Sequence, residues 1–215
     1  MTALRAVGVH KTHRRGREQV HALRGVSIEL HAGEVVALQG RSGSGKTTLL
    51  NCLLGWERPD RGSVVVPGAR DPAGAPWTTV AVVPQRFGLL PELSLAENAA
   101  VPAQLAGLPL AHQAALAVLE RLLLGDLADR LPAEVSLGEQ QRTALARALV
   151  VRPAFVLADE PTGRLDEDLS ALVLTTLRDV AAAAGTGVLV ASHDPVVVAA
   201  ADRVVRLSDG RVTVD

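Results

Sequence analysis

The sequence predicts an α/β fold with a mainly parallel sheet, an N-terminal antiparallel β region and an inserted helical subdomain. Short apolar stretches alternate with segments of helical spacing over most of the 215 residues. Such alternation is typical of parallel sheets, because each parallel crossover needs a helix-length connection. Two apolar stretches come first with no helix between them, and a Leu- and Ala-rich block interrupts the later alternation. Length and pattern together favour one domain, residues 1–215.

Composition argues against several classes of protein. The net charge is -1, so the chain lacks the basic field of a nucleic-acid binder, and the absence of tyrosine leaves few side chains for base stacking. The single cysteine, Cys52, cannot form an intrachain disulfide. The N-terminal residues lack the apolar core of a signal peptide, and proline or charge interrupts the most apolar tracts. We therefore expect a soluble protein of the cytoplasm.

Two strands are predicted before residue 33. Leu4 to Val9 forms the first, and the second lies near Val26 to Leu30, before the turn Ala32-Gly33. The polar stretch between them, Lys11 to Glu18, is predicted to be a solvated loop, although three arginines in it also suit phosphate binding: Arg14, Arg15 and Arg17.

A glycine-rich loop follows the next predicted strand, Glu34 to Leu38. The segment Gly40 to Thr48, GRSGSGKTT, has glycine, four residues, glycine, lysine and then threonine, and it continues into helical spacing over Thr47 to Leu54. This strand, loop and helix order is that of a phosphate-binding P-loop, so the sequence predicts a P-loop NTPase core. An accidental Gly/Ser-rich match is the alternative, and the scarcity of lysine argues against it, since only Lys11 and Lys46 occur.

Each part of this loop has a predicted role in holding ATP and Mg²⁺. The glycines allow a tight turn that points backbone amides and the positive helix end at a triphosphate. Lys46 would reach the β- and γ-phosphates, and the Thr47 hydroxyl would ligate Mg²⁺. The candidate ATP-binding residues of the loop are Gly40, Arg41, Ser42, Gly43, Ser44, Gly45, Lys46, Thr47 and Thr48.

The rest of the chain divides into a helical block and the remainder of the core. Residues from about 87 to 151 show helical periodicity with breaks at Gly107 to Pro109 and at Leu131-Pro132, which predicts the inserted subdomain. The core is predicted to comprise residues of about 1–86 and 152–215. Its further strands are Ser63 to Val66, Thr79 to Val83, Ala154 to Ala158 and Gly187 to Ala191, its helices are Glu167 to Ala184 and Pro195 to Ala200, and a hairpin pairs Arg203 to Leu207 with Arg211 to Val214.

Two adjacent carboxylates end one of these strands. The apolar run Phe155 to Ala158 leads into Asp159 and Glu160. Successive side chains of a strand point in opposite directions, but the chain turns at the strand end. Asp159 can then face Mg²⁺ while Glu160 faces an attacking water as general base. A strand simply capped by acids is the alternative, and the P-loop makes it the weaker one.

A third element, Val135 to Arg142 (VSLGEQQR), begins a helix. Serine and glycine at a helix start provide a hydroxyl and free backbone amides that suit an anion, although an ordinary N-cap has the same composition. The segment closely resembles the signature motif LSGGQ of the ATP-binding cassette (ABC) ATPases. The resemblance implies that Ser136, Gly138 and Glu139 contact ATP.

Other elements of that family occur here in the family's order, and the resemblance covers nearly the whole chain. Gln85 matches the Q-loop glutamine, which implies contact with Mg²⁺ and the attacking water. Pro161 to Asp166 matches the D-loop, with Asp166 at its end, and His193 matches the switch histidine that contacts the γ-phosphate. The candidate catalytic residues are thus Lys46, Gln85, Glu160 and His193, and the candidate metal ligands are Thr47, Gln85 and Asp159.

Three positions depart from the family pattern. Leu137 stands where the signature usually has glycine, and Glu139 where it usually has glutamine. The aromatic residue that stacks on adenine in the family has no tyrosine to match it, and His13 occupies the corresponding position. The sequence therefore predicts a working signature and a weaker platform for the base.

The resemblance implies an ATPase that works as a dimer. In ABC proteins the signature of one subunit closes over the P-loop nucleotide of another. One cassette is therefore expected to form a head-to-tail homodimer, or to pair with a sister cassette, around two ATP molecules. Residues 87–98 and the D-loop PTGRLD are similar to the lipoprotein-release, macrolide-export and cell-division ATPases. Those partner membrane permeases through an apolar groove, for which the candidates here are Phe87, Leu89, Leu90 and Leu93; the alternative is that these four residues belong to the ordinary core of the helical subdomain.

We therefore expect an integral membrane permease as partner, transport or mechanotransmission as the output, and a peripheral location at the inner face of the cell membrane. No nucleic-acid partner is expected. A soluble ABC ATPase acting on DNA or ribosomes is an alternative, against which stand the near-neutral charge and the single cassette. A P-loop kinase is a second alternative, but it would leave Ser136 to Gly138 and His193 unexplained.

Overall fold

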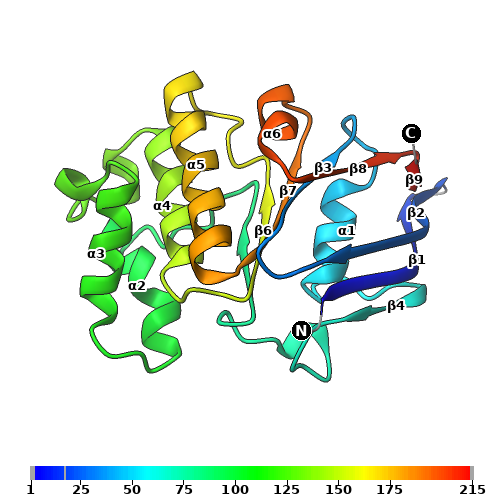
Figure 1. Ribbon diagram of the computed structural model, residues 1–215, viewed down its shortest axis with the longest axis horizontal. Coiled ribbons are helices and arrows are strands. Elements are labelled where there is room, and N and C mark those ends of the chain that lie inside the picture. The colour runs from blue at the N-terminus through cyan, green and yellow to red at the C-terminus, as the bar shows by residue number, and fades with distance from the viewer. Residues whose placement is uncertain (1–2, 17, 214–215) are drawn as a thin grey trace.

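The computed structural model describes residues 3–16 and 18–213 and contains two sheets and a group of helices. Figure 1 shows a small antiparallel sheet at one end, a second sheet flanked by helices in the middle, and helices α2, α3 and α4 at the other end. The predicted fold class is confirmed, with its antiparallel N-terminal region and its mainly parallel core sheet.

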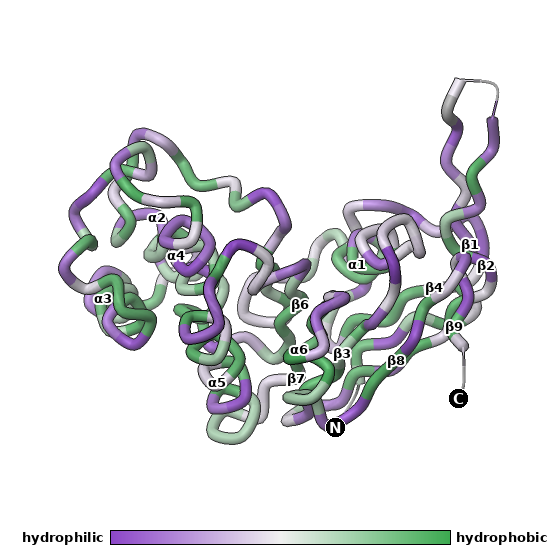
Figure 2. Tube along the Cα trace, turned by 90° about the horizontal axis from the view of Figure 1, so that it is seen from above, coloured by the Kyte–Doolittle hydropathy of each residue, from purple (hydrophilic) through white to green (hydrophobic). Residues whose placement is uncertain are grey.

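The antiparallel sheet contains β1 (Leu4–Arg15), β2 (Glu18–Leu30) and β4 (Arg61–Val65), in the order β2-β1-β4. The prediction of a loop over Lys11 to Glu18 is wrong, because most of that stretch continues the two strands. Arg14 pairs with Gln19 in the register, and Figure 2 shows the resulting hairpin extending away from the rest of the molecule. The predicted arginine Arg17 lies outside the described residues.

Polar contacts explain why these strands continue without an apolar face. The Thr12 amide donates to Asp60 Oδ2 at 2.7 Å, and Lys11 Nζ donates to the carbonyl of Arg58 at 2.8 Å. Thr12 Oγ1 also lies 3.0 Å from His21 Nδ1 across the strand pair. The Thr12–His21 contact is a cross-strand pair, and the other two tie β1 to the segment before β4. Such polar contacts stabilise a sheet without burial, so hydrophobic alternation alone could not reveal them.

The central sheet contains six strands in the order β5-β6-β7-β3-β8-β9. The first five strands in this order run parallel, and β9 pairs with β8 antiparallel, as the predicted closing hairpin requires. The strands agree with prediction to within one or two residues: β3 (Val35–Gln39), β5 (Val80–Val83), β6 (Phe155–Asp159), β7 (Gly187–Ser192), β8 (Arg203–Ser208) and β9 (Arg211–Thr213).

Six α-helices occur in the described ranges. Their bounds are α1 (Lys46–Leu53), α2 (Leu95–Leu105), α3 (Ala111–Arg121), α4 (Leu137–Leu149), α5 (Glu167–Ala184) and α6 (Pro195–Ala200). Short 3-10 turns cover Pro72–Gly74, Gly125–Leu127 and Pro132–Glu134. None of the helices in these ranges is long and apolar enough to span a membrane.

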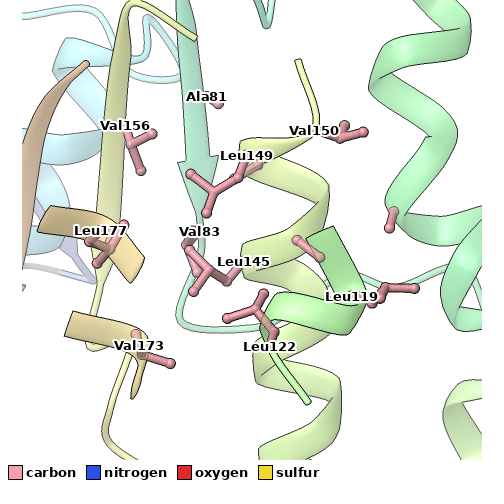
Figure 3. Close-up of a cluster of buried hydrophobic side chains, with 14 of the residues drawn as sticks. Ala81, Val83, Leu119, Leu122, Leu145, Leu149, Val150, Val156, Val173 and Leu177 are labelled. Carbon is pink, nitrogen blue, oxygen red and sulfur yellow. The ribbon is translucent and has the colours of Figure 1, made fainter. Parts of the chain in front are cut away.

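A continuous apolar core joins α3, α4 and α5 to the central sheet. Figure 3 shows Val83 of β5 and Val156 of β6 near Leu145 and Leu149 of α4, together with Leu177 of α5. All five side chains are buried, and burial of each stabilises the fold by about 1.5–3 kcal/mol. This packing holds α4 against the strands whose ends carry the candidate site.

A second apolar cluster lies between the two sheets and includes α1. Leu49, Leu50 and Leu53 of α1 belong to it, with strand residues from both sheets. Cys52 is part of the same cluster and is 1% exposed. Burial, and to a lesser extent the nearby carboxylate of Glu57, raises the pKa of the thiol to about 11. The buried residues of α1 thus hold this helix, which follows the glycine-rich loop, against both sheets.

Candidate functional site

The glycine-rich loop connects β3 to α1 through backbone conformations that favour glycine. Gly43 has a φ of 79° and Gly45, at the N-cap of α1, has a φ of 108°. A Cβ at Gly45 would lie 2.4 Å from the carbonyl oxygen of Ala22 in β2, so a side chain there is excluded twice, by conformation and by space. The loop therefore wraps the start of α1 as the P-loop pattern predicts.

Lys46 stands at the first position of α1, and its side chain folds back over the loop. Its Nζ donates to the carbonyl of Gly40 at 2.7 Å and to that of Arg41 at 3.3 Å, and it lies 3.9 Å from Glu160 Oε1. The side chain is only 9% exposed. Lys46 therefore carries its charge between the loop and the end of β6, where a bound phosphate would lie.

Asp159 ends β6 directly beside α1. Thr47 Oγ1 donates to Asp159 Oδ2 at 2.8 Å, and the carboxylate is buried. Burial raises the pKa of Asp159, and the hydrogen bond from Thr47 offsets part of that effect. Hydroxyl and carboxylate oxygens are donors that Mg²⁺ prefers, and a buried carboxylate gains from a neighbouring cation, so this pair fits a magnesium ion.

Glu160 is held by contacts to both its backbone and its carboxylate. Its φ is 50°, a conformation that non-glycine residues seldom adopt, and its amide donates to Ala191 O at 2.8 Å. Ser192 Oγ donates to Oε2 at 3.0 Å, and His193 Nδ1 lies 2.9 Å from Oε1. The carboxylate therefore projects from the strand end in one defined orientation beside Lys46.

These groups line a single cleft of about 1230 Å³. The volume is ample for a nucleotide, since ligand pockets typically measure about 300–1,000 Å³. Twelve of the candidate residues line it: His13, Arg41, Ser42, Gly43, Gly45, Lys46, Thr47, Thr48, Gln85, Asp159, Glu160 and His193. Six others do not: Gly40, Ser44, Ser136, Gly138, Glu139 and Asp166.

Of these six, Gly40 and Ser44 support the loop from within. A Cβ at Gly40 would lie 2.5 Å from the carbonyl of Leu207 and from Ser44 Oγ. Ser44 is buried, and its amide donates to Arg41 O at 3.1 Å. Asp166 caps α5 instead, because its carboxylate accepts from the Leu169 amide at 2.9 Å.

The start of α4 lies outside the cleft and is bonded to itself. Ser136 is the N-cap, and its hydroxyl accepts from the Glu139 amide at 3.3 Å, while the Glu139 carboxylate accepts from the Ser136 amide at 2.7 Å and from its hydroxyl at 2.8 Å. These bonds lower the pKa of Glu139. Leu137 is 53% exposed. The segment thus presents a capped helix end to solvent.

The D-loop segment packs directly against this helix end. A Cβ at Gly138 would lie 3.1 Å from Leu165 Cδ2 and 3.4 Å from the carbonyl of Arg164. Arg164 itself lines the cleft, with its guanidinium 5.9 Å from the centre of the Phe87 ring. A side chain at position 138 would therefore push the end of the Leu165 side chain away by a few tenths of an ångström.

One wall of the cleft was not foreseen from the sequence. Strand β2 contributes Gln19, Val20, His21 and Ala22, the last of which lies against Gly45 of the P-loop, and the turn at Asp209 and Gly210 completes the wall. His13 lies beside this wall, with Nε2 at 3.3 Å from Thr48 Oγ1 and 3.5 Å from Glu57 Oε2. The sequence pattern predicts a loop over this stretch, so it could not reveal that His13 pairs with Val20 in the strand register and that β2 reaches the cleft.

Gln141 and Ser192 also reach the site and had no predicted role. Gln141 lies on α4, lines the cleft and donates to the carbonyl of Glu160 at 2.8 Å. Ser192 orients the Glu160 carboxylate. The cleft thus combines the cation of Lys46, the backbone amides of the P-loop, the candidate metal ligands Thr47 and Asp159, and the oriented carboxylate of Glu160. These are the groups that phosphoryl transfer from a triphosphate to water requires.

A family model described as ABC transporter matches residues 23–163. The chain belongs to this family. The predicted resemblance is therefore confirmed, and the ABC transporter chain is an ATP-binding subunit and an ATPase.

Relatives of this ABC transporter chain cover it almost completely. It is 38% identical to the lipoprotein-releasing system ATP-binding protein LolD of Paramagnetospirillum magneticum, over 96% of each chain. It is 40% identical to the macrolide export ATP-binding/permease protein MacB of Nitrobacter winogradskyi, over 97% of this chain and 34% of that protein. The predicted similarity to lipoprotein-release and macrolide-export ATPases is confirmed.

Two solved structures share the fold of the ABC transporter chain. One is the dimeric structure of MJ0796, a bacterial ABC transporter cassette, with a TM-score of 0.91 and 31% identity over 98% of this chain and 97% of that one. The other is a post-hydrolysis state of the same cassette bound to ADP and Pi, with a TM-score of 0.90 and 30% identity over the same shares of the two chains.

Proposed function

We propose that two copies of this chain, or one copy and a sister cassette, enclose two ATP molecules head to tail and hydrolyse them to drive a membrane permease. The observation that carries the dimer is the separation of Ser136, Gly138 and Glu139 from the cleft that holds Lys46 and Glu160. A helix end with free amides is useful to a triphosphate only if it faces one. A second chain would bring that helix end to the open side of the cleft.

Within one cleft each side chain has a proposed task. The loop amides and Lys46 bind the phosphates, while Thr47, Asp159 and Gln85 hold Mg²⁺, which when bound offsets charge on the β- and γ-phosphates. Glu160 takes a proton from water as the water oxygen bonds to the γ-phosphorus and the bond to the ADP oxygen breaks. His193 turns the Glu160 carboxylate toward that water.

Two further proposals concern the contact with adenine and the movement of the helical subdomain. His13, beside Thr48 and β2, is proposed to pack against adenine. Residues of about 87–151 are proposed to form a subdomain that moves relative to the core of about 1–86 and 152–215. The signature residues at the start of α4 move with that subdomain, so that nucleotide binding and subunit closure are linked.

The permease is proposed to dock on the apolar segment after Gln85. Leu90 is 45% exposed there, and Phe87, Leu89 and Leu93 are half-buried. Arg147 of α4 holds this segment by donating to the carbonyls of Phe87 and Gly88. The chain would then lie on the inner face of the membrane. Copurification of one integral membrane protein, in a complex that persists after nuclease treatment, is the expected finding.

A mixing experiment tests the head-to-tail arrangement. Lys46→Ala and Ser136→Arg each remove one half of every site, so each purified variant should release no phosphate from ATP. In a mixed dimer, one site joins an intact Lys46 to an intact Ser136. A 1:1 mixture should therefore regain about a quarter of wild-type activity, because half of randomly paired dimers are mixed and each has one intact site.

The control mixes Lys46→Ala with Glu160→Gln. Both changes lie in the same half of the site, so every site of the mixed dimer remains damaged and no activity should return. A mixture of Lys46→Ala and Ser136→Arg that stays as inactive as its components would refute the arrangement. Wild-type activity in Ser136→Arg alone would also refute it.

A further inference from the structure

Gln141 connects the helix that starts at the signature segment to the proposed catalytic base. It lies on α4, one turn after Leu137, and its Nε2 donates to the carbonyl oxygen of Glu160 at 2.8 Å. The side chain is 4% exposed, so water does not compete for this bond. Among the described contacts of Glu160, this hydrogen bond is the one that comes from α4.

The other bonds to Glu160 come from the core sheet and its loops. They involve Ala191, Ser192, His193 and the Gly163 amide, which donates to the same carbonyl at 3.2 Å. The Glu160 peptide is therefore fixed to the core on several sides and to α4 on one. Since Glu160 has a φ of 50°, its backbone conformation depends on such contacts.

The orientation of the Gln141 amide follows from its partner. Only the NH₂ group can donate to a carbonyl, and the reversed amide would place two oxygens against each other. The Gln141 Oε1 atom is buried without a hydrogen-bond partner, which is costly and rare in folded proteins. Within the described residues, the donation to the Glu160 carbonyl is therefore the hydrogen bond that the Gln141 side chain makes.

Helix α4 is rigid enough to transmit a displacement over this distance. Its apolar residues Leu145 and Leu149 pack in the core, and Arg142 Nη1 donates to the carbonyl of Leu122 at 2.6 Å. Gln141 is about 6 Å along the helix axis from Leu137, at 1.5 Å per residue. A shift at the helix start therefore reaches the Glu160 carbonyl through a single side chain.

We propose that Gln141 is a positioning residue for Glu160, and that it ties the geometry of the base to the position of the signature segment. The inference rests on the proposed role of Glu160 in ATP hydrolysis. Gln141 acts on the reaction through its hydrogen bond to the Glu160 peptide, so its loss should lower the rate of the chemical step and not ATP affinity.

The test replaces Gln141 by methionine, which has similar length and no donor. Gln141→Met should lower kcat about five- to tenfold, the loss expected for one hydrogen bond that orients a catalytic group. ATP affinity, measured by fluorescence of a nucleotide analogue, should stay within about twofold. The melting temperature should hardly change, because Gly163 still satisfies the Glu160 carbonyl and the unpaired Oε1 is removed.

Gln140→Met is the matched control on the same helix. Gln140 Nε2 also donates to a backbone carbonyl, that of Pro132, at 2.9 Å, but that bond does not reach Glu160. The control should lower the melting temperature more than Gln141→Met and keep kcat within about twofold. The inference is overturned if Gln141→Met keeps wild-type kcat, or if its kcat falls only in proportion to ATP affinity.

A double variant separates this inference from the proposed function. If Gln141 acts through Glu160, adding Gln141→Met to Glu160→Gln should leave the residual turnover unchanged, because the two effects are not additive. A further five- to tenfold loss would mean that Gln141 acts elsewhere and would overturn the inference. If Glu160→Gln itself retains wild-type turnover, the proposed base is wrong, whatever Gln141 does.

Discussion

At the P-loop end of the cleft, Lys46 and Asp159 are buried and hydrogen-bonded to their neighbours, whereas the start of α4 is exposed and bonded to itself. Lys46 is 9% exposed on its side chain and donates to two loop carbonyls, and Thr47 is bonded to Asp159. Leu137 is 53% exposed, and Ser136 and Glu139 form a capping box. The first region is preorganised before ATP binds, and the second is a stable helix end available to another molecule.

This difference shows how one chain can contain a complete set of groups without a complete site. Preorganised groups at the P-loop lower the reorganisation needed for chemistry. The capping box satisfies the amides of Ser136 and Glu139 without a second chain, which stabilises the exposed helix end and leaves the box independent of any partner. In the proposed head-to-tail arrangement, a site divided in this way is inactive in a single chain, and association of two chains completes it.

The largest effect is expected at the P-loop end of the cleft, from Glu160→Gln. Amide for carboxylate removes the proton acceptor and keeps the shape, so phosphate release should fall by about 10²–10⁴-fold. ATP binding should persist, and the variant should accumulate as a nucleotide-bound dimer, measured by light scattering. Hydrolysis at the wild-type rate would show that Glu160 is not the group that takes the proton from water.

A smaller effect is expected from Asp159→Asn, and it is a gain in the stability of the nucleotide-free protein. Burial raises the pKa of Asp159, so its ionised form destabilises the nucleotide-free fold above that pKa. Asparagine keeps an acceptor for Thr47 and removes the charge. The melting temperature without nucleotide should rise by about 2 °C, while the extra stabilisation that Mg²⁺ gives to the ATP complex should disappear. Equal Mg²⁺ dependence in the two proteins would contradict the ligand role.

The smallest effect is expected at the exposed end, from Glu139→Gln. The pKa of Glu139 is lowered in the fold, so its contribution to stability is present above its ordinary pKa of 4.5 and is lost as the pH falls through the folded value. At pH 7 the variant should lose about 0.5 kcal/mol in urea unfolding. Near pH 3 the two proteins should unfold alike, and a difference that persists there would rule out the charge as its cause.

Sequence pattern predicted the groups that lie close together along the chain. Gly40 to Thr48 and the pair Asp159 and Glu160 each follow a buried strand, and parallel neighbours bring such strand ends to one edge of the sheet. The same reasoning predicted the strands and helices to within a few residues. The exception was the β1–β2 hairpin, where polar cross-strand bonds replace an apolar face.

The remainder of the site depends on contacts that spacing does not encode. The wall from Gln19 to Ala22 reaches the cleft because a long hairpin crosses the P-loop. Gln141 reaches Glu160 because the apolar face of α4 packs on β5 and β6. Both placements follow from tertiary packing, and a single sequence gives no measure of it.

The buried thiol behind the P-loop has a consequence for how the chain behaves under oxidation. Only a thiolate reacts readily with peroxides, disulfides or alkylating agents. With a pKa of about 11 and 1% exposure, Cys52 is ionised in only about one molecule in ten thousand at pH 7. The helix that carries Lys46 and Thr47 is therefore protected from oxidation at its one thiol, and thiol reagents should leave the nucleotide site intact in the folded protein.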